Sequence, residues 1–446
     1  MNPLLRFPRL AFRPPAELRK AQETLLAAHL RHCRRAPFYR GLLAGVPPAR
    51  AARVPLEALR DLPFTTKADL EAGPERFLAV RRDRIRDIVQ SSGTTGLPTQ
   101  MLYTGRDLER LAYNEAVCFA GCGMGRGDRV LLTCTLDRCF VAGYAYCLGA
   151  QAVGAASVRS GLNLVEGHAA VIEQIRPTFL VGVPGFLRKL GHFLHASGHA
   201  PSGIRGLICI GEPLRDARLR PTVLGDDLER LWRAPAYSTY SSSEIVTSFC
   251  ECTAQCGGHA APDLGIVEIV DDNGRPLAPG ETGEIVVTPL GVEGMPLLRF
   301  RTGDIGYLAG EPCACGRNTP RLSAILGRKA QMLKVRGTTF YPATIFEVLN
   351  AIREVSDYYV EVDSADGADR VRVTVAFASD TPDAQRRTLA LLQARLRVRP
   401  EVRVASEEAV RQRVYVAHSR KPVRFFDLRQ QPAAAPRSEE TPCTSP

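Results

Sequence analysis

The sequence has no apolar stretch long enough to cross a membrane. Its longest apolar runs, within residues 130–135 and 140–149, are broken by polar side chains well short of the roughly 18–20 residues that a spanning helix needs. Residues 1–15 also lack the apolar core of a secretory signal. We therefore expect a cytoplasmic protein with no membrane partner.

Two further absences exclude two classes of protein. The 13 cysteines are odd in number and lack the tight spacing of a secreted disulfide scaffold, which indicates a reducing compartment. The lysine-bearing pattern GxxxxGK[ST] does not occur, so the chain is not a P-loop nucleotide hydrolase.

The composition is that of a globular protein with more than one domain. The chain has 446 residues, 45% hydrophobic and 24% charged, close to the average for soluble domains. The net charge of +11 could indicate a nucleic-acid partner, but arginines are scattered through every segment rather than gathered in one arm. We favour a solvated surface whose positive field attracts anionic substrates such as ATP, and no nucleic acid.

The order of apolar runs predicts an α/β fold. Residues 1–87 are mostly helical in pattern, and residues 88–183 alternate short β-branched runs with amphipathic segments, as in a largely parallel sheet. The runs GIVEIVDD, GEIVVTPL and PLLRFRTGD then predict an antiparallel β subdomain. The expected parts are a large N-terminal domain over 1–327, a small α+β domain over 328–430 and a disordered tail over 431–446.

A small, polar, glycine-rich loop is the first candidate site. Its backbone N–H groups and hydroxyls are suited to phosphate oxygens, although an ordinary turn has the same composition. Its residues are Ser91, Ser92, Gly93, Thr94, Thr95 and Gly96.

Three later segments carry complementary chemistry. The run YSSSE, which includes Ser243, supplies an aromatic face for a base at Tyr240 and a carboxylate for Mg²⁺ at Glu244. Asp304 follows a predicted strand, where its carboxylate could accept both ribose hydroxyls. Gly327 and Arg328 open the small domain.

These segments, in this order, resemble the adenylate-forming superfamily of acyl-CoA synthetases, peptide-synthetase adenylation domains and luciferases. The sequence is most similar to the phenylacetate-CoA ligases, whose LPFTTKADL-type lead-in and CACGR segment it shares. The resemblance extends from RRAPFYRGLL to SRKPVRFFDLR.

The resemblance implies a role for each motif. The loop at 91–96 would hold the β- and γ-phosphates, and Tyr240 would stack beside the base. Glu244 would bind Mg²⁺, Asp304 would hold the ribose, and Arg328 would lie near the ribose and phosphates. Lys421, in the closing motif of the mobile small domain, would be the catalytic lysine that offsets charge at the α-phosphate. The adenine pocket would be lined by Gly211, Glu212 and Pro213.

The chain departs from the family pattern at two places. Ser241 replaces the glycine of YGxxE and would crowd the carboxylate pocket, and Lys329-Ala330-Gln331 replaces paired acids at the hinge. The expected acid pocket includes Phe140, Tyr144, Ala236 and Ser241, which would suit an aryl or medium-sized acyl group. The aromatic residues among them are equally suited to a helix core.

The cysteines of two segments, with one histidine, are candidate zinc ligands. Thiolates and imidazole are the ligands that tetrahedral zinc prefers, and free cysteines in a reducing compartment are the alternative. Cys250 and Cys256 could substitute for members of the favoured set. By similarity to relatives that bind zinc there, the favoured ligands of a structural zinc are Cys252, His259, Cys313 and Cys315.

The resemblance implies a two-step reaction. A carboxylic acid attacks the α-phosphate of ATP, and coenzyme A then takes the acyl group as a thioester. The alternatives are transfer to an amine or to a carrier-protein thiol, and a nucleotide-binding module that has lost its chemistry.

Overall fold

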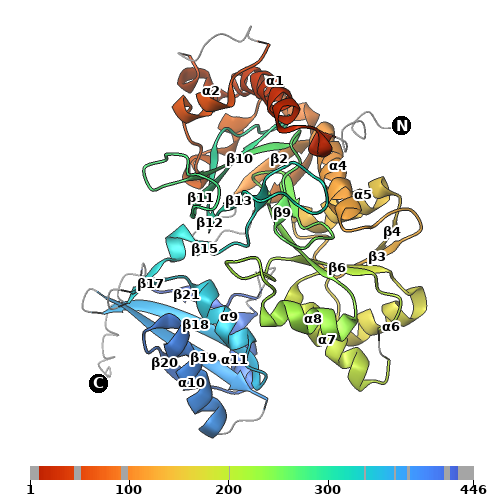
Figure 1. Ribbon diagram of the computed structural model, residues 1–446, viewed down its shortest axis with the longest axis vertical. Coiled ribbons are helices and arrows are strands. Elements are labelled where there is room, and N and C mark those ends of the chain that lie inside the picture. The colour runs from red at the N-terminus through yellow and green to blue at the C-terminus, as the bar shows by residue number, and fades with distance from the viewer. Residues whose placement is uncertain are drawn as a thin grey trace, which may run out of the picture. The chain divides into compact units, whose positions relative to one another are not determined.

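The computed structural model describes residues 10–44, 52–91, 99–199, 201–335, 338–365, 368–378, 382–415 and 422–429. It divides the chain into two compact units, Met1–Ala330 and Gln331–Pro446. Figure 1 shows the first unit in red to cyan and the second in cyan to blue. Among the described residues, no helix is both long and apolar enough to span a membrane.

The large unit begins with helices, as predicted, and continues as mixed α/β structure. Its α-helices are α1 (Pro15–Cys33), α2 (Pro37–Leu42), α3 (Lys67–Glu71), α4 (Gly105–Gly121), α5 (Val141–Val153), α6 (Val165–Ile175), α7 (Pro184–Ala196) and α8 (Val223–Trp232). Short 3₁₀ helices cover Leu10–Phe12, Leu56–Asp61, Pro74–Phe77, Arg82–Arg84 and, at the junction of the units, Lys329–Gln331.

The described strands of the large unit form three sheets. A nine-stranded sheet has the order β13-β14-β9-β8-β7-β6-β5-β3-β4, a four-stranded sheet the order β10-β11-β12-β15, and β1 and β2 make a hairpin. The strands are β1 (Ile85–Gln90), β2 (Gln100–Thr104), β3 (Arg129–Leu132), β4 (Ala156–Arg159), β5 (Phe179–Gly182), β6 (Gly206–Ile210), β7 (Ala236–Ser242), β8 (Thr247–Cys250), β9 (Gly258–His259), β10 (Gly265–Val270), β11 (Gly283–Pro289), β12 (Phe300–Gly306), β13 (Leu308–Ala309), β14 (Arg321–Leu322) and β15 (Gly327–Arg328).

Helices cover both faces of the nine-stranded sheet. Successive residues of a strand point to opposite faces, and β3 follows this rule. Val130 and Leu132 pack in a core that includes residues of α4 and α5, whereas Leu131 packs in a second core with residues of α6, α7 and α8. Figure 1 shows α7 and α8 side by side below this sheet. Strands β3 to β7 are parallel, so their carboxyl ends lie at one edge.

The β subdomain is antiparallel, as the sequence predicts. Strand β11 pairs with β10 on one side and β12 on the other, and β12 pairs in turn with β15. The register places Asp304 directly opposite Arg328. Pairing thus brings together two residues that the sequence separates.

The small unit is α+β. A hairpin of β16 and β17 precedes a four-stranded sheet of order β20-β19-β18-β21, in which the central pair is antiparallel and each outer pair is parallel. Its elements are β16 (Leu333–Val335), β17 (Thr338–Phe340), α9 (Pro342–Asn350), β18 (Val355–Ala365), β19 (Ala368–Phe377), α10 (Pro382–Leu396), β20 (Glu401–Val404), α11 (Glu407–Val414) and β21 (Phe425–Asp427).

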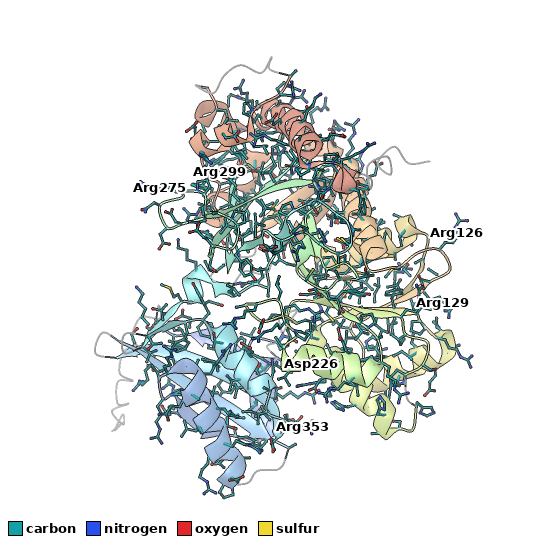
Figure 2. All side chains as sticks on the ribbon, in the orientation of Figure 1. Arg126, Arg129, Asp226, Arg275, Arg299 and Arg353 are labelled. Atoms are coloured by element: carbon teal, nitrogen blue, oxygen red, sulfur yellow. The ribbon has the colours of Figure 1, made fainter. Side chains whose placement is uncertain are left out.

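Exposed arginines occur in both units of the described structure. Arg126 and Arg275 are exposed and lie on opposite sides of the large unit, and Arg353 belongs to the small unit (Figure 2). This distribution agrees with the scattered arginines of the sequence.

Candidate active site

The turns after two parallel strands bring predicted nucleotide-binding residues to one edge of the sheet. Gly211 follows β6 with a φ of +79°, a left-handed conformation that favours glycine. The next residue, Glu212, accepts a hydrogen bond of 2.8 Å from the backbone N–H of Gly185, at the start of α7. Pro213 completes this segment, and the turn after β7 carries Ser243 and Glu244.

Tyr240, Asp304 and Arg328 form a cluster, which we name the Tyr–Asp–Arg cluster. The Tyr240 hydroxyl donates to Oδ2 of Asp304 over 2.8 Å, and Nε of Arg328 donates to Oδ1 over 3.2 Å. The Tyr240 ring also stacks on Phe249, with ring centroids 5.9 Å apart. The structure therefore brings together three residues predicted from separate motifs.

Burial and the neighbouring charges shift the pKa values of this cluster. Burial raises the pKa of Asp304, the charge of Glu244 adds to the rise, and Arg328 and the Tyr240 hydroxyl oppose it. Burial and the Asp304 charge also hold the pKa of Tyr240 well above its usual value, so its hydroxyl stays protonated. Asp304 is thus an acceptor fixed by two donors.

Glu244 lies in a buried turn next to this cluster. Its side chain and that of Ser243 are only 6% and 8% exposed. Among the described residues, no group donates a hydrogen bond to the Glu244 carboxylate. A carboxylate in this position is a suitable oxygen ligand for Mg²⁺.

The predicted phosphate loop lies mostly outside the described residues. Ser92, Gly93, Thr94, Thr95 and Gly96 fall within residues 92–98, which lie outside the described residues.

The two residues at the base of this loop are described. The backbone N–H of Ser91 donates to the Thr99 carbonyl over 2.8 Å. The side-chain hydroxyls of Ser91 and Thr99 are both buried and have no partner in the described structure. Within the described residues, these two buried hydroxyls are therefore available to a polar ligand.

The residues predicted to line the acid pocket do not all lie together. Ser241, near the carboxyl end of β7, is exposed, whereas Ala236, at the opposite end of the strand, is fully buried. Phe140 occupies the residue directly before α5, and Tyr144 on that helix is 41% exposed. Their role in acid binding stays a prediction.

Cys252, His259, Cys313 and Cys315 form a second cluster, which we name the Cys/His cluster. One ligand atom from each lies within 4.8 Å of all the others. The sulfurs of Cys252 and Cys313 are 3.6 Å apart, and the Cys315 sulfur is 3.4 Å from Nε2 of His259. Tetrahedral zinc at about 2.3 Å from each sulfur would need similar separations, roughly 3.8 Å.

The surroundings of His259 also fit a metal ligand. Its Nδ1 bonds to the Thr319 hydroxyl over 2.8 Å, which leaves Nε2 for the cluster. Burial, aided by Arg317 and Arg321, lowers the pKa of His259 to about 4, so the imidazole is neutral. Cys256 lies 3.7 Å from the Cys313 sulfur and remains an alternative ligand.

Three charged or polar residues of this region were not predicted from the sequence. Arg215 and Glu251, 4% and 2% exposed, form a bidentate ion pair, and Glu251 also accepts the backbone N–H of Ser238. The pair joins the segment after β6 to β7 and to the segment that carries Cys252. The sequence feature that could have pointed to Glu251 is its position between two candidate zinc ligands, Cys250 and Cys252. Tyr103, from β2, donates to the carbonyl of Ser243, and no sequence motif marks it.

Comparison with known proteins decides the family. The family model described as AMP-binding enzyme matches residues 48–292, more than half of the chain. The chain belongs to the AMP-binding enzyme family. The model of the AMP-binding enzyme C-terminal domain matches residues 337–429.

The relatives of this AMP-binding enzyme are CoA ligases. It is 34% identical to a phenylacetate-coenzyme A ligase of Thermus thermophilus, with 79% of each chain covered. It is 29% identical to that of Escherichia coli over 93% of this chain and 95% of the relative. A 2-hydroxyisobutyryl-CoA ligase with R3-HIB-AMP in the postadenylation state has the same fold, with a TM-score of 0.82, 21% identity and 94% and 91% of the two chains covered.

These matches confirm the predicted superfamily, the α/β fold class and an adenylate-forming ligase that makes an acyl-adenylate and transfers the acyl group to CoA. Lys421 lies outside the described residues, so its predicted role stays a prediction.

Proposed function

We propose that this AMP-binding enzyme acts on an aryl or arylacetic acid, activating it with ATP and joining it to coenzyme A. The observation that carries the site assignment is the Tyr–Asp–Arg cluster next to Glu244, because it combines a base-stacking ring, a ribose acceptor and a metal-binding carboxylate. The names of the relatives, phenylacetate- and indoleacetate-CoA ligases, support the class of acid.

The described residues have distinct tasks in the adenylation step. Asp304, held by Tyr240 and Arg328, accepts the ribose hydroxyls and so fixes the nucleotide. Arg328 places positive charge near the ribose and phosphates. Glu244 would hold Mg²⁺, which supplies charge stabilisation at the phosphates when bound. The acid carboxylate then attacks the α-phosphorus and pyrophosphate leaves.

Lys421 completes the proposed step by offsetting charge between the carboxylate and the α-phosphate. Replacing Lys421 by Ala should abolish acid-dependent adenylate formation while ATP still binds. Undiminished adenylation by that variant would contradict the role. The matched control is Lys334→Ala, which removes a lysine from the same unit without touching the closing motif.

We also propose that the Cys/His cluster holds one structural zinc ion. The support is the S₃N donor set, the fit of the separations and the neutral His259 ring held by Thr319. All four positions are protein ligands, which is typical of a structural rather than a catalytic site. Thiols that must stay reduced for this purpose favour the cytoplasm as the location.

The acid and the acceptor can be identified in one screen. Phenylacetate, indoleacetate, benzoate and hexanoate are each incubated with ATP and Mg²⁺, with and without CoA. We expect sustained AMP release and an acyl-CoA thioester only with an aromatic acid and CoA. Sustained turnover with an amine or a carrier protein in place of CoA would instead indicate an amide ligase or a carrier-loading enzyme.

A further inference from the structure

The turn that carries Glu244 has a strained backbone. Val246, two residues after Glu244, has a φ of +49°, which is unusual for any residue other than glycine and especially for a β-branched one. Val246 and Ile245 are almost completely buried. A strained conformation of this kind persists only where the surrounding structure fixes it.

Tyr103 fixes one end of this turn. Its side chain is 1% exposed, and its hydroxyl donates to the carbonyl oxygen of Ser243 over 2.6 Å. Burial, together with the charge of Glu244, holds the pKa of Tyr103 well above its usual value, so the hydroxyl remains a donor. The bond ends on the residue directly before Glu244.

Arg110 fixes the other end. Its Nη1 donates to the carbonyl of the strained Val246, and its Nη2 donates to the Thr247 hydroxyl over 3.0 Å. The Thr247 hydroxyl in turn donates to the carbonyl of Ile245 over 2.9 Å. Nε of Arg110 donates to the Leu290 carbonyl over 2.8 Å, which ties this guanidinium to the β subdomain.

Both side chains come from the segment that follows the predicted phosphate loop. Tyr103 lies on β2, and Arg110 lies in the first half of α4, which starts directly after that strand. A capping box between Thr104 and Asp107 fixes the start of α4. Asp107 also accepts the backbone N–H of Glu293 over 2.7 Å.

We propose that Tyr103 and Arg110 are positioning residues that hold the Glu244 carboxylate in place for the metal bound to ATP. This inference rests on the proposed function. Binding of the metal–nucleotide costs less conformational entropy when the carboxylate is already held in a fixed position than when it is mobile. Neither residue touches the nucleotide in this scheme, and each acts through the backbone of residues 243–247.

The substitution Tyr103→Phe tests the proposal, because it removes one hydroxyl and leaves the ring. Acid-dependent pyrophosphate exchange is measured against Mg²⁺ concentration with saturating acid. We expect the half-saturating Mg²⁺ concentration to rise roughly three- to tenfold, the range that the loss of one net hydrogen bond produces. The rate at saturating Mg²⁺ should change little.

Tyr113→Phe is the matched control. Tyr113 is another buried tyrosine, on α4, and its hydroxyl donates to Asp263 over 2.8 Å rather than to a residue of the turn. This variant should keep the wild-type Mg²⁺ profile. Thr247→Val, which removes the hydroxyl between Arg110 and Ile245, should shift the profile in the same direction as Tyr103→Phe, and it decides the matter if Tyr103→Phe does not fold.

Equal Mg²⁺ profiles for wild type, Tyr103→Phe and Thr247→Val would overturn the positioning role, as would a shift of the same size in Tyr113→Phe. If wild type shows no exchange with any acid, the proposed function fails separately. The same variants are then compared by direct titration of Mn²⁺·ATP, which needs no acid. Weaker binding by Tyr103→Phe than by Tyr113→Phe supports the positioning role, and equal binding contradicts it.

Discussion

The Tyr–Asp–Arg cluster and the Cys/His cluster are built from neighbouring stretches of the chain but differ in how their polar groups are satisfied. In the first, two donors already satisfy the Asp304 carboxylate, and one of them, Arg328, also balances its charge. In the second, three thiols and one neutral imidazole direct their ligand atoms at one small volume. The first arrangement is preformed without a ligand, whereas a cation would stabilise the second. We therefore expect changes in the first to affect activity and changes in the second to affect stability.

The ion pair of Arg215 and Glu251 lies between the two regions. Arg215 donates to the carbonyl of Ala236 over 2.8 Å, at the start of the strand that carries Tyr240. Glu251 immediately precedes Cys252. This buried ion pair therefore connects the two regions. Whether the two clusters have separate roles can be tested by changing each of them in turn.

Loss of the proposed zinc should give the largest effect on stability. Cys313→Ser should remove about 4 kcal/mol of stabilisation from metal binding and lower the melting temperature by about 5–10 °C. Acid-dependent exchange at 25 °C should stay within about twofold of wild type, as a structural site implies. Metal analysis and thermal unfolding are measured together, and Cys139→Ser, at an exposed thiol, is the control that should change neither. A loss of activity with unchanged melting temperature would reverse the assignment.

Asp304→Asn should give the largest effect on activity. The substitution keeps the shape of the side chain but removes the charge of the carboxylate. That carboxylate pairs with Arg328 and accepts a hydrogen bond from the Tyr240 hydroxyl. Charged hydrogen bonds contribute about 2–3 kcal/mol, so kcat/KM for ATP should fall roughly 100-fold with little change in melting temperature. Asp363→Asn, which alters an arginine-paired carboxylate on β18, should leave kcat/KM unchanged. Similar kinetics for both variants would remove Asp304 from the site.

Glu115 is a reference for a buried acid that belongs to neither cluster. Burial raises its pKa to about 7, partly opposed by the Ser248 hydroxyl and Asn114. Because the folded-state pKa exceeds the unfolded value, the folded protein binds more protons between about pH 4.5 and 7, and stability falls as pH rises through this window. In Glu115→Gln, the fall in the free energy of unfolding across this window should be smaller by about 1–2 kcal/mol. Urea unfolding at pH 5 and pH 8 measures it, and parallel pH profiles of the two proteins would contradict the account.

Tyr240→Phe should give the smallest effect. It removes one hydrogen bond to Asp304 but keeps the ring that stacks on Phe249. A net loss of about 1 kcal/mol predicts a roughly fivefold rise in KM for ATP, with kcat nearly unchanged. Tyr358→Phe, which removes a hydroxyl in the small unit, is the control. An effect as large as that of Asp304→Asn would mean that the hydroxyl contacts the nucleotide directly.

The secondary-structure elements and the members of the two clusters could be predicted from the sequence more fully than the contacts that hold them in place. The β-branched runs at 265–270 and 283–289 predicted antiparallel strands because their pattern and turns are local. The register that sets Asp304 opposite Arg328 is not local, and only family resemblance linked those residues. Tyr103, Arg110 and the Arg215–Glu251 pair were missed, because each acts through a distant backbone or a buried partner that no spacing rule encodes.

The most direct test of the central claim is ATP–pyrophosphate exchange by the purified protein with an aromatic acid, Mg²⁺ and no CoA. The account predicts exchange that requires the acid and is strongly reduced in Asp304→Asn. ATP binding without exchange for any acid, aromatic or aliphatic, would contradict it and indicate a nucleotide-binding module without adenylation chemistry.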